Sequence, residues 1–306
     1  MNVELIEEKK RKVIERFGPW TAHNIWLKDD VYTINKEVIG DEVKLRRILQ
    51  CVSDISQRPL SSLRILDLAC LEGLYAVEFA RHGAKVLGIE GREPNIEKAR
   101  FAKEVIALEN LELVQDDVRN LSKEKYGHFD VVLCLGILYH LDVPDVFAFL
   151  EQIAEVCLGF VLIDTHISIV HEKSYLYREK KYWGSVYKEH DINSTSDEIS
   201  KRLWMSLDNP ESFWFTRPSL YNVLSHVGFT SVYECHIPPE PDKPFDRVTL
   251  LAMRGQRQDL FCSPLLSSQP IKDLAEKAGY PRRKLHIISK LIPASIKKVI
   301  KRFIYS

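Results

Sequence analysis

The stretch that most constrains the fold is Leu63–Gly73, which reads LRILDLACLEG. A short apolar run ends at Asp67, a loop of small residues follows, and a helical pattern begins at Leu74. A buried strand, a tight turn and a helix in this order place a ligand at the carboxyl end of the strand. They also direct the free N–H groups of the helix's first turn toward that ligand. We therefore expect an α/β domain of the nucleotide-binding type around this turn.

An acidic residue at the end of a second apolar run indicates which class of ligand the turn binds. Glu90 follows Asp67 by 23 residues and ends the strand-like run 85–90. A carboxylate at this place accepts hydrogen bonds from ribose hydroxyls. The turn holds one late glycine, Gly73, and has no G-x-G-x-x-G pattern, so a dinucleotide is disfavoured.

Four segments, in order and at family spacing, resemble class I S-adenosylmethionine (SAM)-dependent methyltransferases, specifically the methyltransferase type 11/12-like domains. Residues 67–73 resemble the first motif, usually D-x-G-x-G-x-G, with alanine and leucine in place of two glycines. Glu90 matches the acidic ribose position. Residues 115–118 (QDDV) match the adenine segment, and residues 129–141 (FDVVLCLGILYHL) match strand four with its following motif. The resemblance covers roughly residues 63–164 and returns more weakly at 218–253.

The resemblance implies SAM as the cofactor and S-adenosylhomocysteine (SAH) as the product. It implies that Asp67 orients the first turn or reaches the cofactor's amino group through water, that Glu90 holds the ribose and that Asp117 meets the adenine amino group. The cofactor-binding residues expected from it are Asp67, Ala69, Cys70, Gly73, Glu90, Gly91, Asp117, Val118, Leu135 and Gly136. The six cysteines form no C-x-x-C pair, so we expect no metal site.

The residues expected to bind the methyl acceptor, here called the acceptor half of the site, are histidines and aromatic residues. His140 follows strand four and His166 follows strand five, and a histidine can act as general base near neutral pH. The alternative for each is a structural role, such as capping the next helix. Aromatic side chains suit stacking on a sugar or another ring. The expected substrate contacts are Trp26, Tyr139, Tyr175, Trp183 and Trp214.

Alternating apolar runs and helical patterns predict a doubly wound, mostly parallel sheet. The resemblance implies that this sheet has the seven strands of the Rossmann-like methyltransferase type. Residues 1–60 are expected to form an N-terminal helical cap or lid, and residues 61–255 the SAM-binding domain. Residues 165–216 form an insertion after strand five, rich in aromatic residues but without a strong period, and are the expected substrate region. The expected strands are 63–68, 85–90, 111–115, 129–135 and 159–164, followed by antiparallel strands 232–236 and 247–252. The expected helices are 1–17, 37–56, 74–82, 93–108, 143–157 and 218–227.

The tail, residues 256–306, differs in character from the domain. In 296–304, apolar side chains fall on one face of a helix and Lys or Arg on the other, as in helices that lie on an anionic membrane surface. Docking on the domain or on a second subunit of a homo-oligomer is an alternative, and RNA phosphate contact is a third. The cysteine usage and the absence of an apolar leader predict a cytoplasmic protein, peripheral at the membrane if the tail binds lipid.

The sequence favours an enzyme that moves the SAM methyl group to an oxygen or nitrogen of a bulky small molecule, such as a glycan, a lipid-linked sugar or a natural product. One alternative is a tRNA-modifying enzyme. Residues 136–140 and 215–220 are similar to the tRNA wobble-uridine carboxymethyl transferase branch. The formal net charge of zero does not favour a nucleic-acid partner. A non-catalytic scaffold, whose altered turn no longer binds SAM, is the other alternative.

Overall fold

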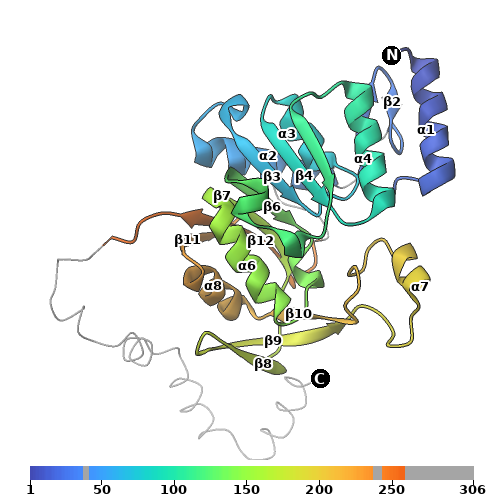
Figure 1. Cartoon of the computed structure of the whole chain (residues 1–306). Helices are drawn as coiled ribbons and strands as arrows, with labels where there is room; N and C mark the ends of the chain where they lie inside the picture. Colours follow the sequence, from blue (N-terminus) through green and yellow to red (C-terminus); the bar gives the residue numbers. More distant parts are fainter. Residues whose placement is uncertain (37–40, 237–242, 259–306) are drawn as a thin grey trace, which may run out of the picture. The chain divides into compact units, whose positions relative to one another are not determined.

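The computed structural model describes residues 1–36, 41–236 and 243–258 (Figure 1). A central sheet of seven strands has the order β11-β12-β7-β6-β3-β4-β5. Its strands are β3 (Arg64–Leu68), β4 (Lys85–Glu90), β5 (Leu111–Gln115), β6 (Phe129–Leu135), β7 (Cys157–His166), β11 (Phe229–Glu234) and β12 (Arg247–Arg254). The first five are parallel, whereas β12 runs antiparallel to both β7 and β11. The predicted mostly parallel, seven-stranded fold is confirmed.

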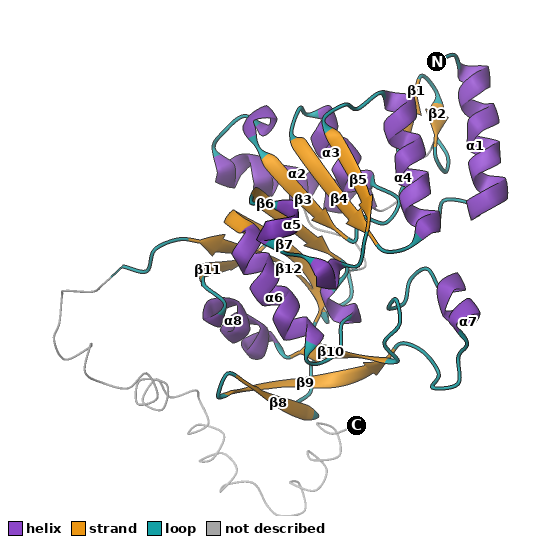
Figure 2. Cartoon of the chain, viewed as in Figure 1, coloured by secondary structure: helices purple, strands orange, loops and turns teal. Residues whose placement is uncertain are grey.

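Helices cover both faces of this sheet (Figure 2). Successive strand residues point to opposite faces, so Ile65 packs beneath α2 (Asp41–Ser56), α3 (Leu74–Arg81) and α4 (Glu93–Ile106). Its neighbour Leu66 belongs to the core beneath α6 (Asp145–Val156) and α8 (Arg217–His226). The short segments between these elements are η1 (Leu60–Ser62), η2 (Val118–Asn120), α5 (Lys123–Tyr126) and η3 (Leu138–His140). The helix and strand boundaries lie close to those predicted.

The N-terminal segment packs beside the sheet. Helix α1 (Val3–Phe17) lies along α4, and a short hairpin of β1 (Trp26–Lys28) and β2 (Val31–Tyr32) follows (Figure 1). Trp20 is buried against Phe101, with ring centroids 5.5 Å apart. The predicted helix 37–56 begins at Asp41 in the structure, and residues 37–40 lie outside the described residues.

The insertion holds regular structure that its sequence did not indicate. Strands β8 (Lys173–Tyr177), β9 (Lys180–Lys188) and β10 (Glu211–Phe215) form an antiparallel sheet of order β10-β9-β8, and α7 (Ser196–Lys201) stands between β9 and β10. One face of this small sheet buries Tyr182, Phe213 and Phe215, and Phe147 of α6 contacts Tyr182 and Phe215. The insertion is therefore fixed to the domain by an aromatic core.

By internal contacts, residues 1–256 form one compact unit. The predicted amphipathic tail helix falls in residues 259–306, which lie outside the described residues. No helix in the described part of the chain is long and apolar enough to cross a membrane.

Candidate active site

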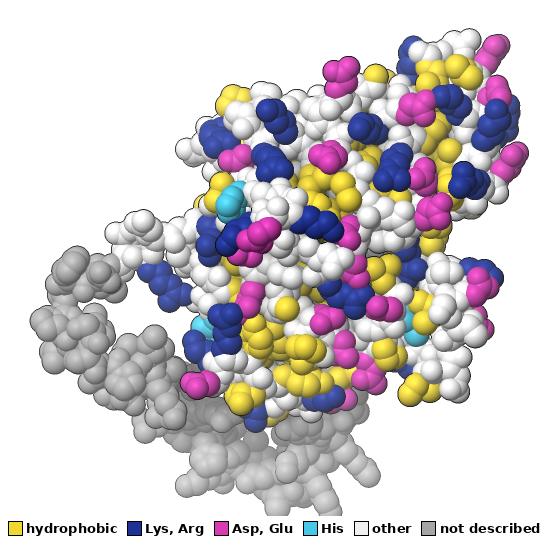
Figure 3. Space-filling view, viewed as in Figure 1, with side chains coloured by type: hydrophobic (Ala, Val, Ile, Leu, Met, Phe, Trp, Pro, Cys, Tyr) yellow, Lys and Arg dark blue, Asp and Glu magenta, His cyan; other side chains and the backbone are white. Residues whose placement is uncertain are grey.

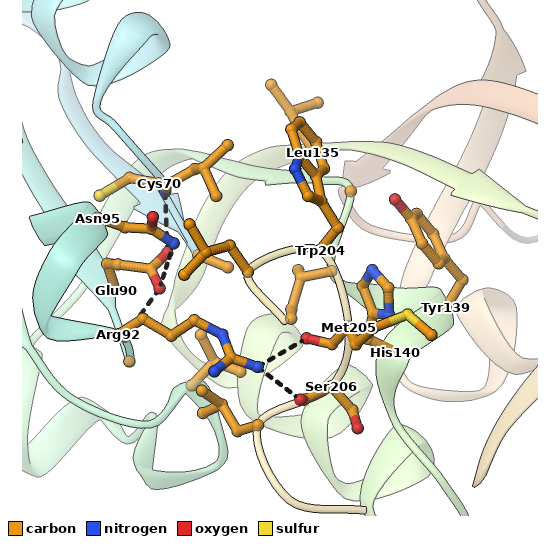
Figure 4. Close-up of a pocket in the computed structure, with 18 of the residues that line it drawn as sticks. Cys70, Glu90, Arg92, Asn95, Leu135, Tyr139, His140, Trp204, Met205 and Ser206 are labelled. Carbon is orange, nitrogen blue, oxygen red and sulfur yellow. Dashed lines mark hydrogen bonds between the residues drawn. The ribbon is translucent and has the colours of Figure 1, made fainter. Parts of the chain in front are cut away.

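A cavity of about 270 Å³ opens at the edge of the sheet where the order of the strands reverses. Strand β3 lies between β4 and β6, so its carboxyl end is the switch point at which open α/β sheets bind ligands. The turn after β3, the end of β4 and the loop after β6 all line this cavity. Figure 4 shows Glu90 and Asn95 on one side of it and Tyr139 and His140 on the other.

The turn after β3 keeps a glycine-like backbone at all three motif positions. Ala69, Leu71 and Gly73 have φ of +53°, +50° and +90°. The left-handed conformation costs a residue with a Cβ about 1–2 kcal/mol, so the surrounding structure must hold Ala69 and Leu71 in place. One such constraint is a hydrogen bond in which the Leu71 N–H donates to Glu90 Oε2 at 2.9 Å.

Glu90 is buried, with an exposed fraction of 5%. Its carboxylate also accepts from the Arg92 N–H at 2.9 Å and from the Asn95 side chain at 3.5 Å. Burial raises the pKa of Glu90, and these hydrogen bonds oppose the rise. Asn95 Oδ1 is buried without a hydrogen-bond partner among the described residues. The two side chains thus offer acceptor oxygens to hydroxyl groups in the cavity.

Two aspartates behave differently from one another. Asp67 is buried and accepts from the Ala76 N–H at 3.1 Å, and burial raises the pKa of Asp67 to about 8. Asp117 is half-buried, and its carboxylate oxygens are engaged by the Arg119 side chain at 2.6–3.1 Å. A ligand amino group would therefore share Asp117 with Arg119.

A histidine–carboxylate pair stands at the acceptor side. His140, in η3, lies with Nδ1 at 2.9 and 3.1 Å from the two oxygens of Glu189. The Ser206 N–H donates to the same carboxylate at 2.9 Å. Burial alone would raise the pKa of Glu189, but the hydrogen bonds from His140 and Ser206 lower it. A carboxylate cannot donate, so the proton between the two groups is on His140 Nδ1.

Cations surround a second buried carboxylate beside this pair. Asp164 lies 3.1 Å from Lys44 Nζ and 2.7 Å from the Arg247 guanidinium. Thr249 donates to it at 2.7 Å, and the neighbouring cations lower the pKa of Asp164 despite its burial. Arg247 also lies over the Tyr139 ring, 5.6 Å from its centroid.

Glu72, a residue of the first turn, holds the N-terminal segment against the cavity. The buried Glu72 carboxylate accepts from the N–H groups of Thr21, Ala22 and His23 at 2.8–3.1 Å and is paired with the buried Lys98 at 3.2 Å. His23 lines the cavity, and its Nδ1 accepts from the Leu74 N–H at 3.1 Å. Burial lowers the pKa of His23 to about 4, so the ring is neutral.

The structure brings most of the predicted cofactor residues together. Nine of the ten line the cavity, the exception being Gly73. A Cβ on Gly73 would lie 2.8 Å from Ala99 Cβ, so this glycine serves the contact between α3 and α4. His140 and Tyr139 also line the cavity, as predicted for the acceptor half.

The remaining predicted residues lie elsewhere. His166 and Trp214 form a second layer behind Tyr139, stacked with centroids 4.8 Å apart, and the Trp214 indole N–H donates to the Tyr139 carbonyl at 2.9 Å. Burial and Arg247 lower the pKa of His166. Tyr175 packs on Phe213. Trp26, 49% exposed on β1, and Trp183, 37% exposed on β9, are outside this cavity.

Sequence reasoning missed several residues of the cavity. The segment Leu203–Leu207 comes from the insertion, as does Glu189, which contacts His140 from outside the cavity lining. Lys44 and Arg247 come from the predicted helix 37–56 and strand 247–252, to which no site residue was assigned. The signal for Glu189 was weak, since one acidic residue after an aromatic strand has no distinctive pattern.

Comparison with known proteins finds methyltransferases among the relatives of this chain. Residues 65–158 match the family model of a methyltransferase domain. Two relatives are the ubiquinone biosynthesis O-methyltransferases of Acinetobacter baylyi, 34% identical over 122 residues, and Rickettsia akari, 31% identical over 121 residues. Each alignment covers 39% of this chain and, respectively, 49% and 46% of the relative. The chain thus spans about half the length of the curated relatives it matches.

Solved structures agree on the fold. The N-terminal domain of EvdMO1 with SAH bound matches with a TM-score of 0.64 at 23% identity, covering 84% of this chain and 98% of that one. The same domain in the presence of SAH and D-fucose gives 0.63 at 24% identity, with the same coverage. The fold of this chain is thus similar to that of the class I SAM-dependent methyltransferase superfamily, and residues 65–158 match a methyltransferase domain.

The residues present fit the cofactor of that superfamily. Glu90 and Asn95 offer buried oxygen acceptors to a diol, and Val118 and Leu207 offer apolar walls to a ring. The buried Asp67 lies behind the first turn, where a cationic ligand would favour its ionised form.

Proposed function

We propose that this chain transfers a methyl group from SAM to a hydroxyl oxygen of a small molecule, with His140 as the general base. The observation that carries the proposal is the His140–Glu189 pair, because His140 lines the same cavity as Glu90 and the first turn while the buried Glu189 holds its ring. Glu189 fixes the imidazole orientation and stabilises the charged ring that proton uptake creates.

When bound, SAM supplies a methyl group already activated by its sulfonium. The acceptor oxygen forms a bond to that carbon while the carbon–sulfur bond breaks and its electron pair stays on sulfur. His140 Nδ1–H donates to Glu189, so Nε2 is the nitrogen that takes the hydroxyl proton. A hydroxyl needs such a base more than an amine does, so the pair favours oxygen over nitrogen as the acceptor.

A sugar-bearing molecule is the acceptor class that we propose. Tyr139 lines the cavity with an aromatic ring, the kind of group that stacks on a sugar, and the Arg247 guanidinium lies over that ring. The EvdMO1 domain of the same fold was crystallised with SAH in the presence of D-fucose. A glycan, a lipid-linked sugar or a glycosylated natural product provides the hydroxyl group and bulk that this site suits.

The test is transfer of labelled methyl from SAM to a panel containing D-fucose, other deoxysugars and glycosylated natural products, with bulk tRNA as a separate arm. We expect label in the sugar arm. His140→Gln should lower the rate at least about a hundredfold, because general-base catalysis contributes that much or more. SAH affinity should stay unchanged, and His128→Gln, an exposed histidine outside the cavity, should behave as wild type.

Three outcomes would contradict the proposal. Label in tRNA alone would favour the nucleic-acid alternative. Binding of SAM with no transfer to any acceptor class would favour the scaffold alternative. A fully active His140→Gln would remove His140 from the chemistry.

A further inference from the structure

One stretch of the insertion lies across the cavity. Residues Leu203–Leu207, here called the closing segment, all line it. Leu207 packs on the backbone just beyond Glu90, since a Cβ added to Gly91 would lie 2.7 Å from Leu207 Cδ1. The closing segment therefore covers the side of the cavity that carries the cofactor residues.

Arg92 holds the closing segment at that side. It is 8% exposed, and its guanidinium donates to the carbonyls of Met205 and Ser206 at 3.1 and 2.7 Å, as Figure 4 shows. Two further carbonyls, of Ile199 and Ser200 in α7, accept from it at 3.3 Å. The Arg92 N–H donates to Glu90, so the two residues are rigidly linked.

The same segment is fastened at the acceptor side. Ser206 presents its carbonyl to Arg92 and its N–H to Glu189, the residue that orients His140. His190 Nε2 lies 2.9 Å from the Ser206 carbonyl, and Asn209 donates to the His140 carbonyl at 2.9 Å. A chain of hydrogen bonds thus runs from Arg92 through Ser206 and Glu189 to His140.

We propose that Arg92 is a positioning residue that couples closure of segment Leu203–Leu207 over the cofactor to the orientation of His140. The role of His140 as base rests on the proposed function, but the coupling itself does not. When the closing segment is displaced, Glu189 loses the Ser206 N–H and His140 loses its fixed partner. The base is then oriented when the cofactor side is covered, which keeps the activated methyl group from water.

The experiment compares Arg92→Met and Arg92→Lys with Arg100→Met, a matched control. Arg100 is on α4, the helix that begins directly after Arg92, and also donates to a carbonyl, that of Leu113, but does not line the cavity. Three readouts need no acceptor. They are the dissociation rate of SAH by stopped flow, tryptic cleavage after Lys201 and Arg202 beside the closing segment, and the NMR ring signals of His140, assigned by their loss in His140→Gln.

We expect Arg92→Met to speed SAH dissociation about tenfold or more, since it removes several charged hydrogen bonds. Cleavage beside the closing segment should accelerate, and the His140 ring signals should move. Arg92→Lys should give a smaller change in each, and Arg100→Met none. If Arg92→Lys, which keeps the buried charge and protects the fold, and Arg92→Met both leave SAH dissociation and the His140 signals as in wild type, the coupling is overturned. Absence of methyl transfer in wild type, with these shifts present, would contradict the proposed function and leave the coupling in place.

Discussion

Ala69 and Gly73 share a left-handed backbone but have different surroundings. Replacing Ala69 with glycine removes backbone strain of about 1–2 kcal/mol and adds unfolded-state entropy worth about 0.4–1 kcal/mol. Ala69→Gly should therefore raise the free energy of unfolding slightly. Gly73→Ala should lower it by about 2 kcal/mol or more, because the new Cβ would meet Ala99 at 2.8 Å. Urea unfolding of the two variants measures both signs, and equal effects would contradict this account of the turn.

His23 should make the fold sensitive to mild acid. Burial lowers the pKa of His23 to about 4, below its ordinary value of 6.5. Between these values the unfolded chain binds a proton that the folded chain does not, so stability falls as pH drops from 6.5 toward 4, by about 3 kcal/mol at most. Unfolding free energies measured from pH 7 to 4.5 should fall less steeply in His23→Asn. An identical slope in the variant would show that His23 is not the group responsible.

At the scale of elements, Glu72 joins the first turn to the N-terminal segment. Removing this carboxylate leaves Lys98 buried without its charge partner and frees the backbone N–H groups of residues 21–23. Breaking a buried ion pair costs about 3–5 kcal/mol, so Glu72→Ala should destabilise the protein by that order. It should also weaken SAH binding, since Ala22 and His23 line the cavity.

Glu78→Ala is the matched control for that prediction. Glu78 is on α3 and pairs with Arg81 one turn further along the same helix, where such pairs contribute about 0.2–0.5 kcal/mol. Thermal unfolding and SAH calorimetry on both variants provide the comparison. A Glu72→Ala variant as stable as Glu78→Ala would contradict the role given to Glu72.

Elements differ in how far the sequence predicts them. The parallel strands were predicted because strands buried on both faces are continuous apolar runs, as in residues 129–135. Strands β8–β10 were not predicted, because adjacent Tyr182 and Trp183 put aromatic residues on both faces of β9 and hide the alternation.

The two halves of the site also differ in how far the sequence predicts them. The predicted cofactor residues lie in one turn and at the ends of strands, where local patterns mark them. The acceptor half depends on Glu189, which meets His140 from 49 residues away, a pairing that no local pattern indicates.

At the scale of the whole molecule, 43 basic and 43 acidic residues give no net charge, so attraction to an anionic surface depends on local clusters. The predicted amphipathic helix at 296–304 lies outside the described residues. We predict that the full chain sediments with vesicles containing anionic lipid at low salt and less so at high salt. Deleting residues 295–306 should abolish sedimentation and leave SAH affinity intact. A full chain that stays in the supernatant under all these conditions would exclude the membrane role.

Calorimetric titration with SAM and SAH tests the central claim most directly, because it asks whether this cavity holds the cofactor with its altered first turn. We predict micromolar binding of both by wild type and by His140→Gln. Glu90→Ala should bind more than about tenfold more weakly, since it loses a charged hydrogen-bond acceptor. Binding of neither compound by wild type, or undiminished binding by Glu90→Ala, would contradict the assignment of this cavity as the SAM site.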